Sequence, residues 1–399
     1  MVAADHPYDV VLFGATGFTG GLTADYLAAH GPAELRWALA GRSEERLAAV
    51  RDRLAAAHPG RPELAELPLL LADAADPDSL AEVAATTQVV ATTVGPYLHH
   101  GGPLVAACAA AGTDYVDLTG EPEFVDRAYV EHHATAAGTG ARLVHACGFD
   151  SIPHDLGAYF TIGELADELG GQIAGPVRMR GVVRSNATFS GGTFHSAITA
   201  FSRARQMREA ARERRRLEPR PDGRRSRASA AKPGRDPELG LWLLPLPTID
   251  PFVVARSGAA LPSYGPDFTY THFAGTKTLR YAAGGAVGAT GLTLAAQVKP
   301  VREALLKRVP QGQGPSEKRR EKSWFTVDLV AESDGTTVRT RVSGGDPGYT
   351  ETSKMLAESA LSLALDENPV TAGQVTTAAA MGDALIGRLQ RAGIAFERR

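Results

Sequence analysis

A glycine-rich segment near the start of the chain limits the possible folds more than any other feature. It reads GATGFTG and lies between the apolar run YDVVLF and a helical pattern at residues 18–30. A first glycine permits a tight turn, a second lets the backbone approach a pyrophosphate, and a third lets the helix pack close to the strand. The free N–H groups at the helix start would then meet the phosphates. The segment predicts a dinucleotide site formed by Gly14, Ala15, Thr16, Gly17, Phe18 and Thr19.

Apolar runs and helical patterns alternate through the first 150 residues. The runs after the first one are LRWALAG, LPLLLAD, QVVATTVG, DYVDLTG and ARLVHACG. Short, nearly continuous apolar strands separated by helices indicate a parallel sheet that is covered on both faces. Right-handed crossovers give such a sheet the doubly wound arrangement. We therefore predict an α/β Rossmann domain over residues 1–150. The alternative is an α/β domain in which the glycine turn binds nothing.

The regular alternation ends after residue 150, which predicts a second domain of the α+β class. At 399 residues the chain is long enough for two domains. Residues 151–370 are expected to bind substrate and to dimerise, and residues 371–399 to return to the first domain as a helix and a strand. The expected elements are strands at 177–185, 248–257 and 267–273, a helix at 191–216, a basic loop at 220–238, a hairpin with Asp334 and Gly335 at its tip, and a helix at 349–366.

Composition narrows the functional classes. Hydrophobic residues make up 44% and charged residues 22%, as in globular proteins, and the net charge of -3 gives no reason to expect nucleic acid as a partner. The two cysteines, Cys108 and Cys147, exclude a disulfide framework and have no metal-ligand spacing. The residues before Val10 lack the pattern of a secretory signal. We predict a cytoplasmic protein without a metal.

One charge-free stretch, residues 281–298, is the best candidate for membrane contact. It reads YAAGGAVGATGLTLAAQV and consists mostly of Ala, Gly and Thr. Such residues gain little from lipid compared with Leu or Ile. We therefore expect a buried, closely packed helix, and the alternative is a weak, peripheral contact with a membrane surface.

The end of the second predicted strand distinguishes between the two nicotinamide cofactors. NAD sites usually have Asp or Glu there, whereas this chain has Arg42 and Ser43. A guanidinium and a hydroxyl suit the 2′-phosphate of NADP(H), which is the predicted cofactor. The alternative for Arg42 is a solvated residue at the start of a helix. Asp73 is placed for the adenine amino group or, equally well, for an N-cap.

The fourth predicted strand ends in TTVGPYLHHGG, where a doubly wound fold binds its ligands. Val94, Gly95 and Pro96 would pass the nicotinamide side of the cofactor. Tyr97 and His99 follow and are the catalytic candidates, Tyr97 as proton donor or positioning group. The alternative for each is a surface residue without a catalytic role.

The segment CGFDSIPHDLG joins the two predicted domains, and its residues suggest structural roles. Asp150 and Ser151 are suited to cap the following helix, and Pro153 fits its first turn. Cys147 has no activating base nearby in sequence and is not a candidate nucleophile.

The motifs above resemble those of the saccharopine-dehydrogenase-like oxidoreductases, and especially the trans-acting enoyl reductase branch. The broad resemblance is carried by GATGFTG, TTVGPYLHHGGPLVAACAAAGTDYVDLTGE and HACGFDSIPHDLG, and the branch by SGGTFHSA, GGDPGYTETSKMLAESALSLA and TTAAAMGDALIGRLQRAGIAFE. The resemblance implies a Rossmann domain, a second domain with a sheet, and reduction with NADPH. Enoyl reductases of this branch act on polyketide-derived lipid chains presented by a separate synthase. Other members of the broad family act on amine or imine bonds.

Two further segments are candidates for substrate and partner contacts. Gly191 and Gly192 precede a helix and could contact substrate, and His195 on that helix is a substrate contact or a packing residue. The basic stretch at 203–227 is either a solvated helix and loop or a docking site for an acidic acyl carrier protein or its phosphopantetheine group.

Three functions remain open at the level of sequence. The first is an NADPH-dependent reductase of an activated carbon–carbon double bond. The second is an imine reductase or amine dehydrogenase, whose amino-acid substrate would need arginine partners. The third is an NADP-binding scaffold or sensor without catalysis. The apolar stretch LWLLPLPTIDPFVVA favours an acyl substrate, small or carrier-bound, and a homodimer is a further expectation. The candidate arginines for the second function are Arg178, Arg180, Arg184 and Arg256.

Overall fold

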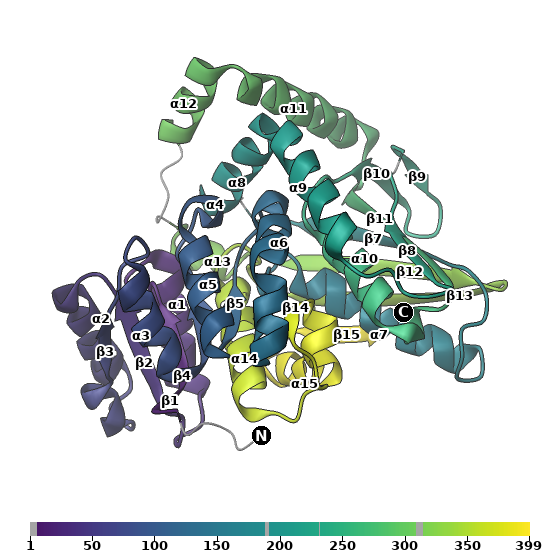
Figure 1. Cartoon of the computed structure of the whole chain (residues 1–399). Helices are drawn as coiled ribbons and strands as arrows, with labels where there is room; N and C mark the ends of the chain where they lie inside the picture. The colour runs from purple at the N-terminus through teal and green to yellow at the C-terminus, as the bar shows by residue number, and fades with distance from the viewer. Residues whose placement is uncertain (1–5, 188–190, 231, 309–313) are drawn as a thin grey trace.

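The computed structural model describes residues 6–187, 191–230, 232–308 and 314–399. Its two sheets each carry their own helices, and the chain crosses between the two parts more than once (Figure 1).

The first sheet has seven parallel strands in the order β14-β6-β5-β4-β1-β2-β3. In β1, Val11 pairs with Ala38 on one side and with Val90 on the other. This order, with β1 central and strands added on both sides of it, confirms the predicted doubly wound fold. The strands are β1 (Tyr8–Phe13), β2 (Trp37–Gly41), β3 (Leu69–Leu71), β4 (Thr87–Thr92), β5 (Asp114–Asp117), β6 (Arg142–Val144) and β14 (Gly373–Val375).

Helices cover both faces of this sheet, which explains why its central strands are mainly apolar on both sides. Successive residues of β1 point to opposite faces, so that Val10 and Leu12 lie in one buried cluster while Val11 and Phe13 lie in another. The first cluster lies under α1 (Phe18–His30), α2 (Glu44–Ala57) and α14 (Thr350–Leu365). The second lies under α3 (Pro77–Ala85), α5 (Gly102–Ala111) and α6 (Pro122–Thr139). Two short helices complete this part, η1 (Pro62–Glu66) and α4 (Tyr97–His100).

The second sheet is mixed and has eight strands in the order β15-β13-β12-β7-β11-β10-β9, with β8 paired to β11. Its β12–β13 hairpin turns at Asp334 and Gly335, which both have positive φ, as the sequence predicts. The strands are β7 (Val177–Ser185), β8 (Arg225–Ala228), β9 (Gly234–Asp236), β10 (Leu241–Pro245), β11 (Asp267–Thr276), β12 (Phe325–Ser333), β13 (Thr336–Gly344) and β15 (Ala395–Arg398). The helices of this part are α7 (Ile152–Glu168), α8 (Gly191–Ser202), α9 (Ala204–Leu217), α10 (Asp250–Ala260), η2 (Pro262–Tyr264), α11 (Leu279–Gln297), α12 (Lys299–Arg308), α13 (Glu317–Arg320) and α15 (Thr377–Arg391).

Two local expectations for the second domain are wrong. The segment TIDPFVVARS forms helix α10 and not a strand, because Pro251 occupies its first turn and Val253 and Val254 are buried on one side of it. The basic segment at 220–238 is not wholly a loop, since it contributes β8 beside β11 and β9 beside β10. The pairing of β8 with β11 joins residues that are distant in sequence, whereas β9 and β10 form a local antiparallel pair.

The charge-free stretch at 281–298 is not a buried helix, contrary to expectation. It forms most of α11, which together with α12 projects from the molecule in Figure 1, and its side chains Tyr281, Val287 and Leu294 are 68%, 74% and 65% exposed. Among the α11 side chains that the structure describes, the small residues Ala282 and Ala296 are buried. Within the described residues, no helix is long and apolar enough to cross a membrane.

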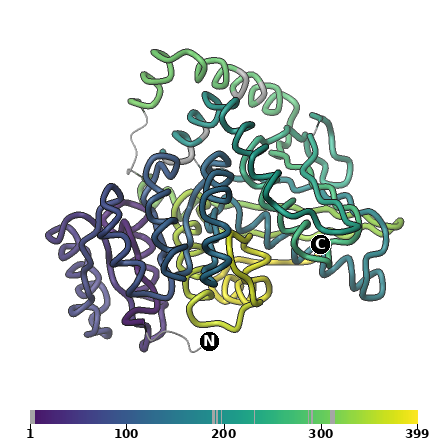
Figure 2. Tube along the Cα trace, viewed as in Figure 1, coloured from purple at the N-terminus to yellow at the C-terminus, as the bar shows by residue number. Residues whose placement is uncertain are grey.

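The C-terminal part of the chain joins the two sheets. Helix α14, expected in the second domain, covers the first sheet, and β14 extends that sheet beside β6. The final strand β15 pairs with β13 of the second sheet, with Phe396 opposite Val342, so the expected return of this strand to the first domain is wrong. The trace of Figure 2 shows this C-terminal part in yellow between the two sheets.

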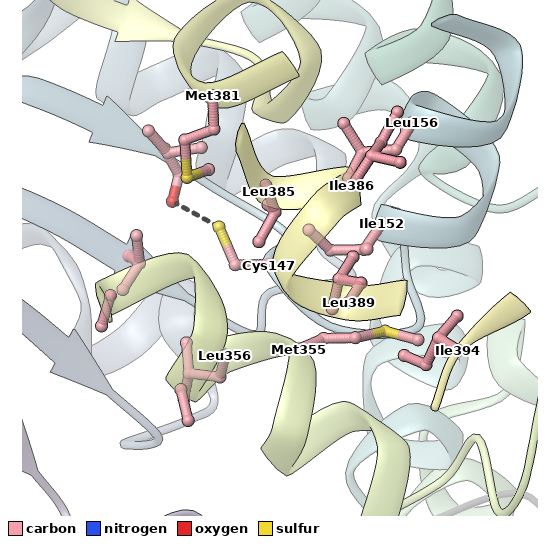
Figure 3. Packing of buried hydrophobic residues seen from close by; sticks show 14 of the residues in the cluster. Cys147, Ile152, Leu156, Met355, Leu356, Met381, Leu385, Ile386, Leu389 and Ile394 are labelled. Carbon is pink, nitrogen blue, oxygen red and sulfur yellow. Dashed lines mark hydrogen bonds between the residues drawn. The ribbon is translucent and has the colours of Figure 1, made fainter. Parts of the chain in front are cut away.

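A shared apolar core holds the two parts together. Figure 3 shows Cys147 and Ile152, from the segment that joins the predicted domains, packed with Met355 of α14 and Leu385 of α15. All four side chains are completely buried. Cys147 is therefore a core residue, in agreement with its rejection as a nucleophile, and burial raises the pKa of its thiol well above the ordinary value.

Candidate cofactor and active site

The glycine turn between β1 and α1 leaves no room for side chains at two of its three glycines. Gly14 has φ 93°, and a Cβ atom there would lie 2.7 Å from Cγ2 of Val94. A Cβ atom on Gly20 would collide with the carbonyl oxygen of Gly14. The tight turn and the close approach of helix to strand are thus built as the sequence predicts.

The middle glycine of the turn faces outward. Gly17 is exposed, and a Cβ atom there would have the carbonyl oxygen of Gly14, at 3.4 Å, as its nearest neighbour. Helix α1 starts at the next residue, Phe18, and its first-turn N–H groups have no partners within the helix itself. An open backbone surface beside a helix N-terminus is a cradle that fits a pyrophosphate. Ala15 is buried below it, and Thr16 and Thr19 are half-buried at its edges.

The predicted 2′-phosphate contacts lie at the end of β2. Arg42 is exposed, and no ion pair involves it among the described residues. Ser43 is the N-cap of α2, and its Oγ accepts a hydrogen bond from the Arg46 N–H at 3.4 Å, so its hydroxyl proton remains available to an anion. Asp73 accepts a hydrogen bond from the Ala75 N–H at 3.0 Å within its own turn. The N-cap of α3 is Asp76, so Asp73 does not have that alternative role.

Replacing Arg42 by alanine should weaken NADPH binding selectively. A charge-assisted hydrogen bond to the 2′-phosphate is worth about 1.5–3 kcal/mol, which corresponds to roughly tenfold to hundredfold in affinity. NADH lacks this phosphate, so its affinity should not change. Calorimetric titration of both cofactors measures the effect, and Arg46→Ala, one turn away and also exposed, is the matched control. Equal losses for NADPH and NADH would exclude Arg42 as the phosphate ligand.

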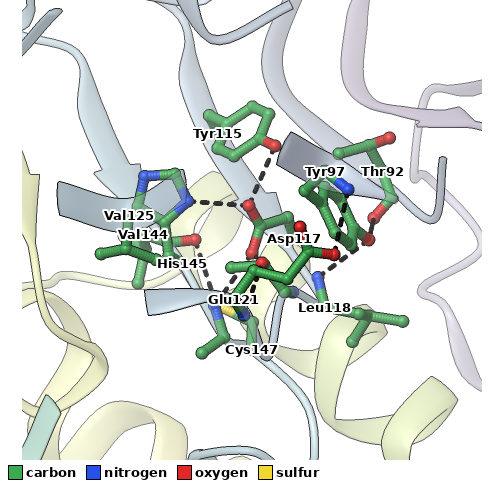
Figure 4. A network of polar contacts seen from close by, with 12 residues as sticks. Thr92, Tyr97, Tyr115, Asp117, Leu118, Glu121, Val125, Val144, His145 and Cys147 are labelled. Carbon is green, nitrogen blue, oxygen red and sulfur yellow. Dashed lines mark hydrogen bonds and ion pairs between the residues drawn. The ribbon is translucent and has the colours of Figure 1, made fainter. Parts of the chain in front are cut away.

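Tyr97 connects the ends of two neighbouring strands (Figure 4). Its side chain is 6% exposed, and its hydroxyl donates a hydrogen bond to the Thr92 carbonyl oxygen at 3.1 Å and accepts one from the Leu118 N–H at 3.2 Å. Burial raises the pKa of Tyr97 well above its ordinary value. This geometry suits the positioning role that the sequence allows for Tyr97 better than the role of proton donor. His99, two residues further along α4, is exposed.

Sequence reasoning missed Glu121, a buried carboxylate that links three elements of the site. It accepts hydrogen bonds from the N–H groups of Tyr97 at 3.3 Å and Leu98 at 2.9 Å, and therefore caps α4. It also accepts a hydrogen bond from the hydroxyl of Ser196 on α8 at 3.2 Å. Its position directly after the fifth apolar run was the available signal. Glu121 thus fixes the turn with Val94, Gly95 and Pro96 relative to the second domain.

A second buried carboxylate, Asp117, organises the carboxyl end of β5. It accepts hydrogen bonds from the Tyr115 hydroxyl at 3.0 Å and from the Thr119 N–H at 3.0 Å, and it contacts Nδ1 of His145 at 2.7 Å. Figure 4 shows the contacts of Tyr115 and His145 converging on Asp117. The network holds the ends of β5 and β6 in fixed positions beside Tyr97.

Residues of the second domain lie directly on the glycine turn. The ring of Tyr349 packs edge-on against Phe18, with ring centroids 4.9 Å apart, and the Arg320 guanidinium lies 5.6 Å from the centre of the Phe18 ring. The Tyr349 hydroxyl accepts a hydrogen bond from the Gly191 N–H at 3.4 Å. Helix α8, which carries the predicted substrate residues Gly191, Gly192 and His195, therefore begins beside the cofactor cradle.

The sequence suggests that Asp150 caps the following helix, and the structure does not confirm this role. Helix α7 begins at Ile152 with Ser151 as its N-cap, and the Ser151 side chain makes no capping hydrogen bond. Asp150 is half-buried, and its Oδ2 lies 3.4 Å from the position of a Cβ atom on Gly120, beyond the end of β5. Burial and the nearby Asp250 carboxylate raise the pKa of Asp150 to about 7, while His154 opposes the shift. A carboxyl group with this pKa is suited to acid–base chemistry at neutral pH.

His154 and Asp250 form a buried ion pair whose charges act on Asp150. Nδ1 of His154 is 3.1 Å from the Asp250 carboxylate, and Nε2 of His272 is 3.5 Å from it. Burial lowers the pKa of His272 to about 3, so this ring is neutral. Burial also acts to lower the pKa of His154, but the Asp250 carboxylate outweighs this effect and raises it. The three residues come from α7, α10 and β11, and no sequence spacing brings them together.

Comparison with known proteins agrees with this geometry. The family described as the saccharopine dehydrogenase NADP binding domain matches residues 10–144. A Mycobacterium tuberculosis relative, provisionally named a trans-acting enoyl reductase, is 41% identical and covers 100% of this chain and 99% of its own length. A trans-acting enoyl reductase of Mycobacterium bovis is 38% identical, with coverage of 99% of this chain and 98% of that protein.

A solved structure shares the fold across both domains. Apo saccharopine dehydrogenase (L-Glu forming) from Saccharomyces cerevisiae has a TM-score of 0.56 and 13% identity, and the match covers 98% of this chain and 99% of that chain. Because residues 10–144 match an NADP binding domain, NADP(H) is the cofactor, as predicted. Its pyrophosphate fits the cradle at Gly17. The chain is an NADP-dependent oxidoreductase that belongs to the saccharopine-dehydrogenase-like family, in the branch of the trans-acting enoyl reductases.

Proposed function

We propose that this protein reduces the carbon–carbon double bond of an enoyl thioester on a lipid-type acyl chain that a separate synthase or acyl carrier protein presents. The observation that carries this proposal is the 41% identity to a trans-acting enoyl reductase over the whole chain. The similarity includes the second domain, which supplies the elements next to the cofactor cradle. It is therefore not limited to the nucleotide-binding part that many oxidoreductases share.

The reaction needs a hydride at the β-carbon of the enoyl group and a proton at the α-carbon. NADPH supplies the hydride when bound. Asp150 is the proposed proton donor, because its carboxyl group lies beyond the carboxyl end of β5 and keeps its proton up to about neutral pH. Tyr97 and Glu121 are positioning residues that fix the turn beside the nicotinamide. His99 remains a catalytic candidate, and Gly191, Gly192 and His195 remain candidates for substrate contacts.

Imine reduction on an amino-acid substrate is the less favoured alternative. Such a substrate needs cationic partners for its carboxylates. Arg180 is already paired with Asp236 and Glu332, and Arg256 with Glu218. Two of the four candidate arginines thus already pair with carboxylates of this chain, which makes them poor partners for the carboxylates of an amino-acid substrate.

The basic helix α9 is the proposed docking site for the acyl carrier. A cavity of about 180 Å³ lies between α6, α9 and α10. Apolar side chains line it together with arginines, of which Arg208 and Arg215 are exposed. This mixture suits a phosphopantetheine arm, which combines a phosphate with a long, weakly polar chain. The lining includes Val125, Met207, Phe252, Arg208, Arg214, Arg215 and Arg256.

NADPH oxidation should be observed with enoyl thioesters and not with imines. Carrier-bound enoyl substrates should have a lower KM than the same acyl group on free pantetheine, because docking adds binding energy. The double variant Arg208→Glu, Arg215→Glu should raise KM for the carrier-bound form and leave the free thioester unaffected. Turnover of imines alone would contradict the proposed reaction. An equal effect of the variant on both forms would contradict the docking site.

A further inference from the structure

The projecting arm formed by α11 and α12 concentrates the exposed apolar surface of the molecule. Of the twelve large apolar side chains that are exposed in the described part of the chain, six lie between residues 279 and 301. Surface of this kind is normally scattered, and its concentration marks an interaction site. The six are Leu279, Tyr281, Val287, Leu294, Val298 and Val301, with exposures of 56%, 68%, 74%, 65%, 49% and 42%.

Three of these side chains form a stripe along α11. At 3.6 residues per turn, Leu279, Val287 and Leu294 fall within about 80° of the helix circumference and extend over about 22 Å. Ala282 and Ala296 are buried, and at 3.6 residues per turn both lie outside the arc of the stripe. At the end of the helix, the Gln297 side chain donates a hydrogen bond to the Phe201 carbonyl oxygen of α8 at 2.6 Å. The arm is therefore fixed to the body of the protein with its apolar stripe facing outward.

The charges that flank the stripe are almost all positive. Between residues 277 and 308 the sequence has a single acidic residue, Glu303. The exposed basic residues of the same segment are Lys277, Arg280, Lys299, Lys307 and Arg308. An apolar helix face bordered by lysine and arginine is typical of helices that lie at the surface of an anionic membrane.

We propose that the arm docks the protein onto an anionic lipid bilayer, with the stripe at Leu279, Val287 and Leu294 inserted among the acyl chains. A second copy of this chain is a poor partner, because stacking two arms would bring like charges together. Because α11 projects from the molecule, its exposed face can contact a flat and deformable surface such as a bilayer. The arm lies beside α8 in Figure 1, so docking would hold the substrate side of the site near the bilayer. This inference concerns binding and does not depend on the proposed reaction.

Co-sedimentation of the NADPH-bound protein with lipid vesicles tests the proposal. We expect binding to vesicles of equimolar phosphatidylcholine and phosphatidylglycerol, little binding to pure phosphatidylcholine, and weaker binding as salt increases. The triple variant Leu279→Ser, Val287→Ser, Leu294→Ser should lose vesicle affinity by about tenfold or more, since it removes the inserted apolar groups. The matched control is Leu71→Ser, Leu365→Ser, Val370→Ser, whose side chains are also exposed but lie elsewhere.

Several results would overturn the proposal. They are absence of binding to anionic vesicles, equal losses in the two triple variants, and a homodimer in sedimentation velocity that the α11 variant converts to monomer. Saturable binding of the stripe to an acidic carrier protein without vesicle binding would also overturn it. Unchanged thermal unfolding shows that the variants are folded. NADPH oxidation with a water-soluble enoyl thioester should be unaffected by the α11 variant, which separates failure of docking from failure of the proposed reaction.

Discussion

Replacing Gly17 by valine should abolish NADPH binding and leave the protein folded. Within the described part of the chain, the only atom that a Cβ at this position would meet within 4 Å is the carbonyl oxygen of Gly14, at 3.4 Å. The folded protein therefore accommodates the first carbon of the side chain. The branched remainder would occupy the space above the turn that the pyrophosphate needs. We expect the affinity for NADPH to fall by at least about a hundredfold, since phosphate contacts to the helix N-terminus are charge-assisted.

Two other glycines provide matched comparisons for Gly17→Val. Gly20→Val should prevent correct folding, because its side chain would collide with the backbone of Gly14. Gly60→Val has open space around it and should change neither folding nor cofactor binding. Calorimetric titration with NADPH, together with thermal unfolding, distinguishes the three cases. A folded Gly17→Val protein with normal NADPH affinity would exclude the turn as the phosphate site.

Replacing Asp150 by asparagine should lower turnover of enoyl thioesters by roughly a hundredfold to ten-thousandfold, the usual cost of losing a general acid. NADPH affinity should be preserved, because Asp150 lies at the domain link and not at the glycine turn. The raised pKa keeps the carboxyl group protonated at acidic and neutral pH. Proton donation requires this form, so kcat of the unmodified protein should fall as the pH rises through about 7. In Asp150→Asn this decrease should disappear.

Variants of Tyr97 and His154 separate proton donation from positioning. Tyr97→Phe removes hydrogen bonds at the ends of β4 and β5, so it should lower kcat but retain the decrease near pH 7. His154→Gln removes the group that opposes the raised pKa of Asp150, so the decrease should move to higher pH. Full turnover in Asp150→Asn, or an unchanged decrease near pH 7 in that variant, would exclude Asp150 as the proton donor.

The nucleotide-binding half of the fold follows from local patterns in the sequence. Most strands of the first sheet are short, mainly apolar runs because both faces are covered, and the starts of α1 and α2 are marked by Gly17 and Ser43. Strand β14, with the sequence GQV, is an exception that no local pattern predicts. Gly14 and Gly20 could be assigned from their spacing and from the strand and helix around them, although the contact that excludes a side chain at Gly14 comes from Val94, which is distant in sequence. The choice of NADP(H) rested in the same way on Arg42 and Ser43 directly after one strand.

Only the tertiary structure placed the residues that meet from distant parts of the chain. Asp150 reads as a helix cap in sequence, and its raised pKa arises from burial near Asp250, a residue of another helix one hundred positions later. Strand β15 pairs with β13 because Phe396 buries itself beside Val342, a contact that no local pattern encodes. Helix α11 is apolar in sequence yet exposed, because burial depends on which surfaces remain uncovered after the rest of the chain has packed. Spacing along the chain sets local conformation, whereas long-range packing sets solvent exposure, pKa and the meeting of side chains.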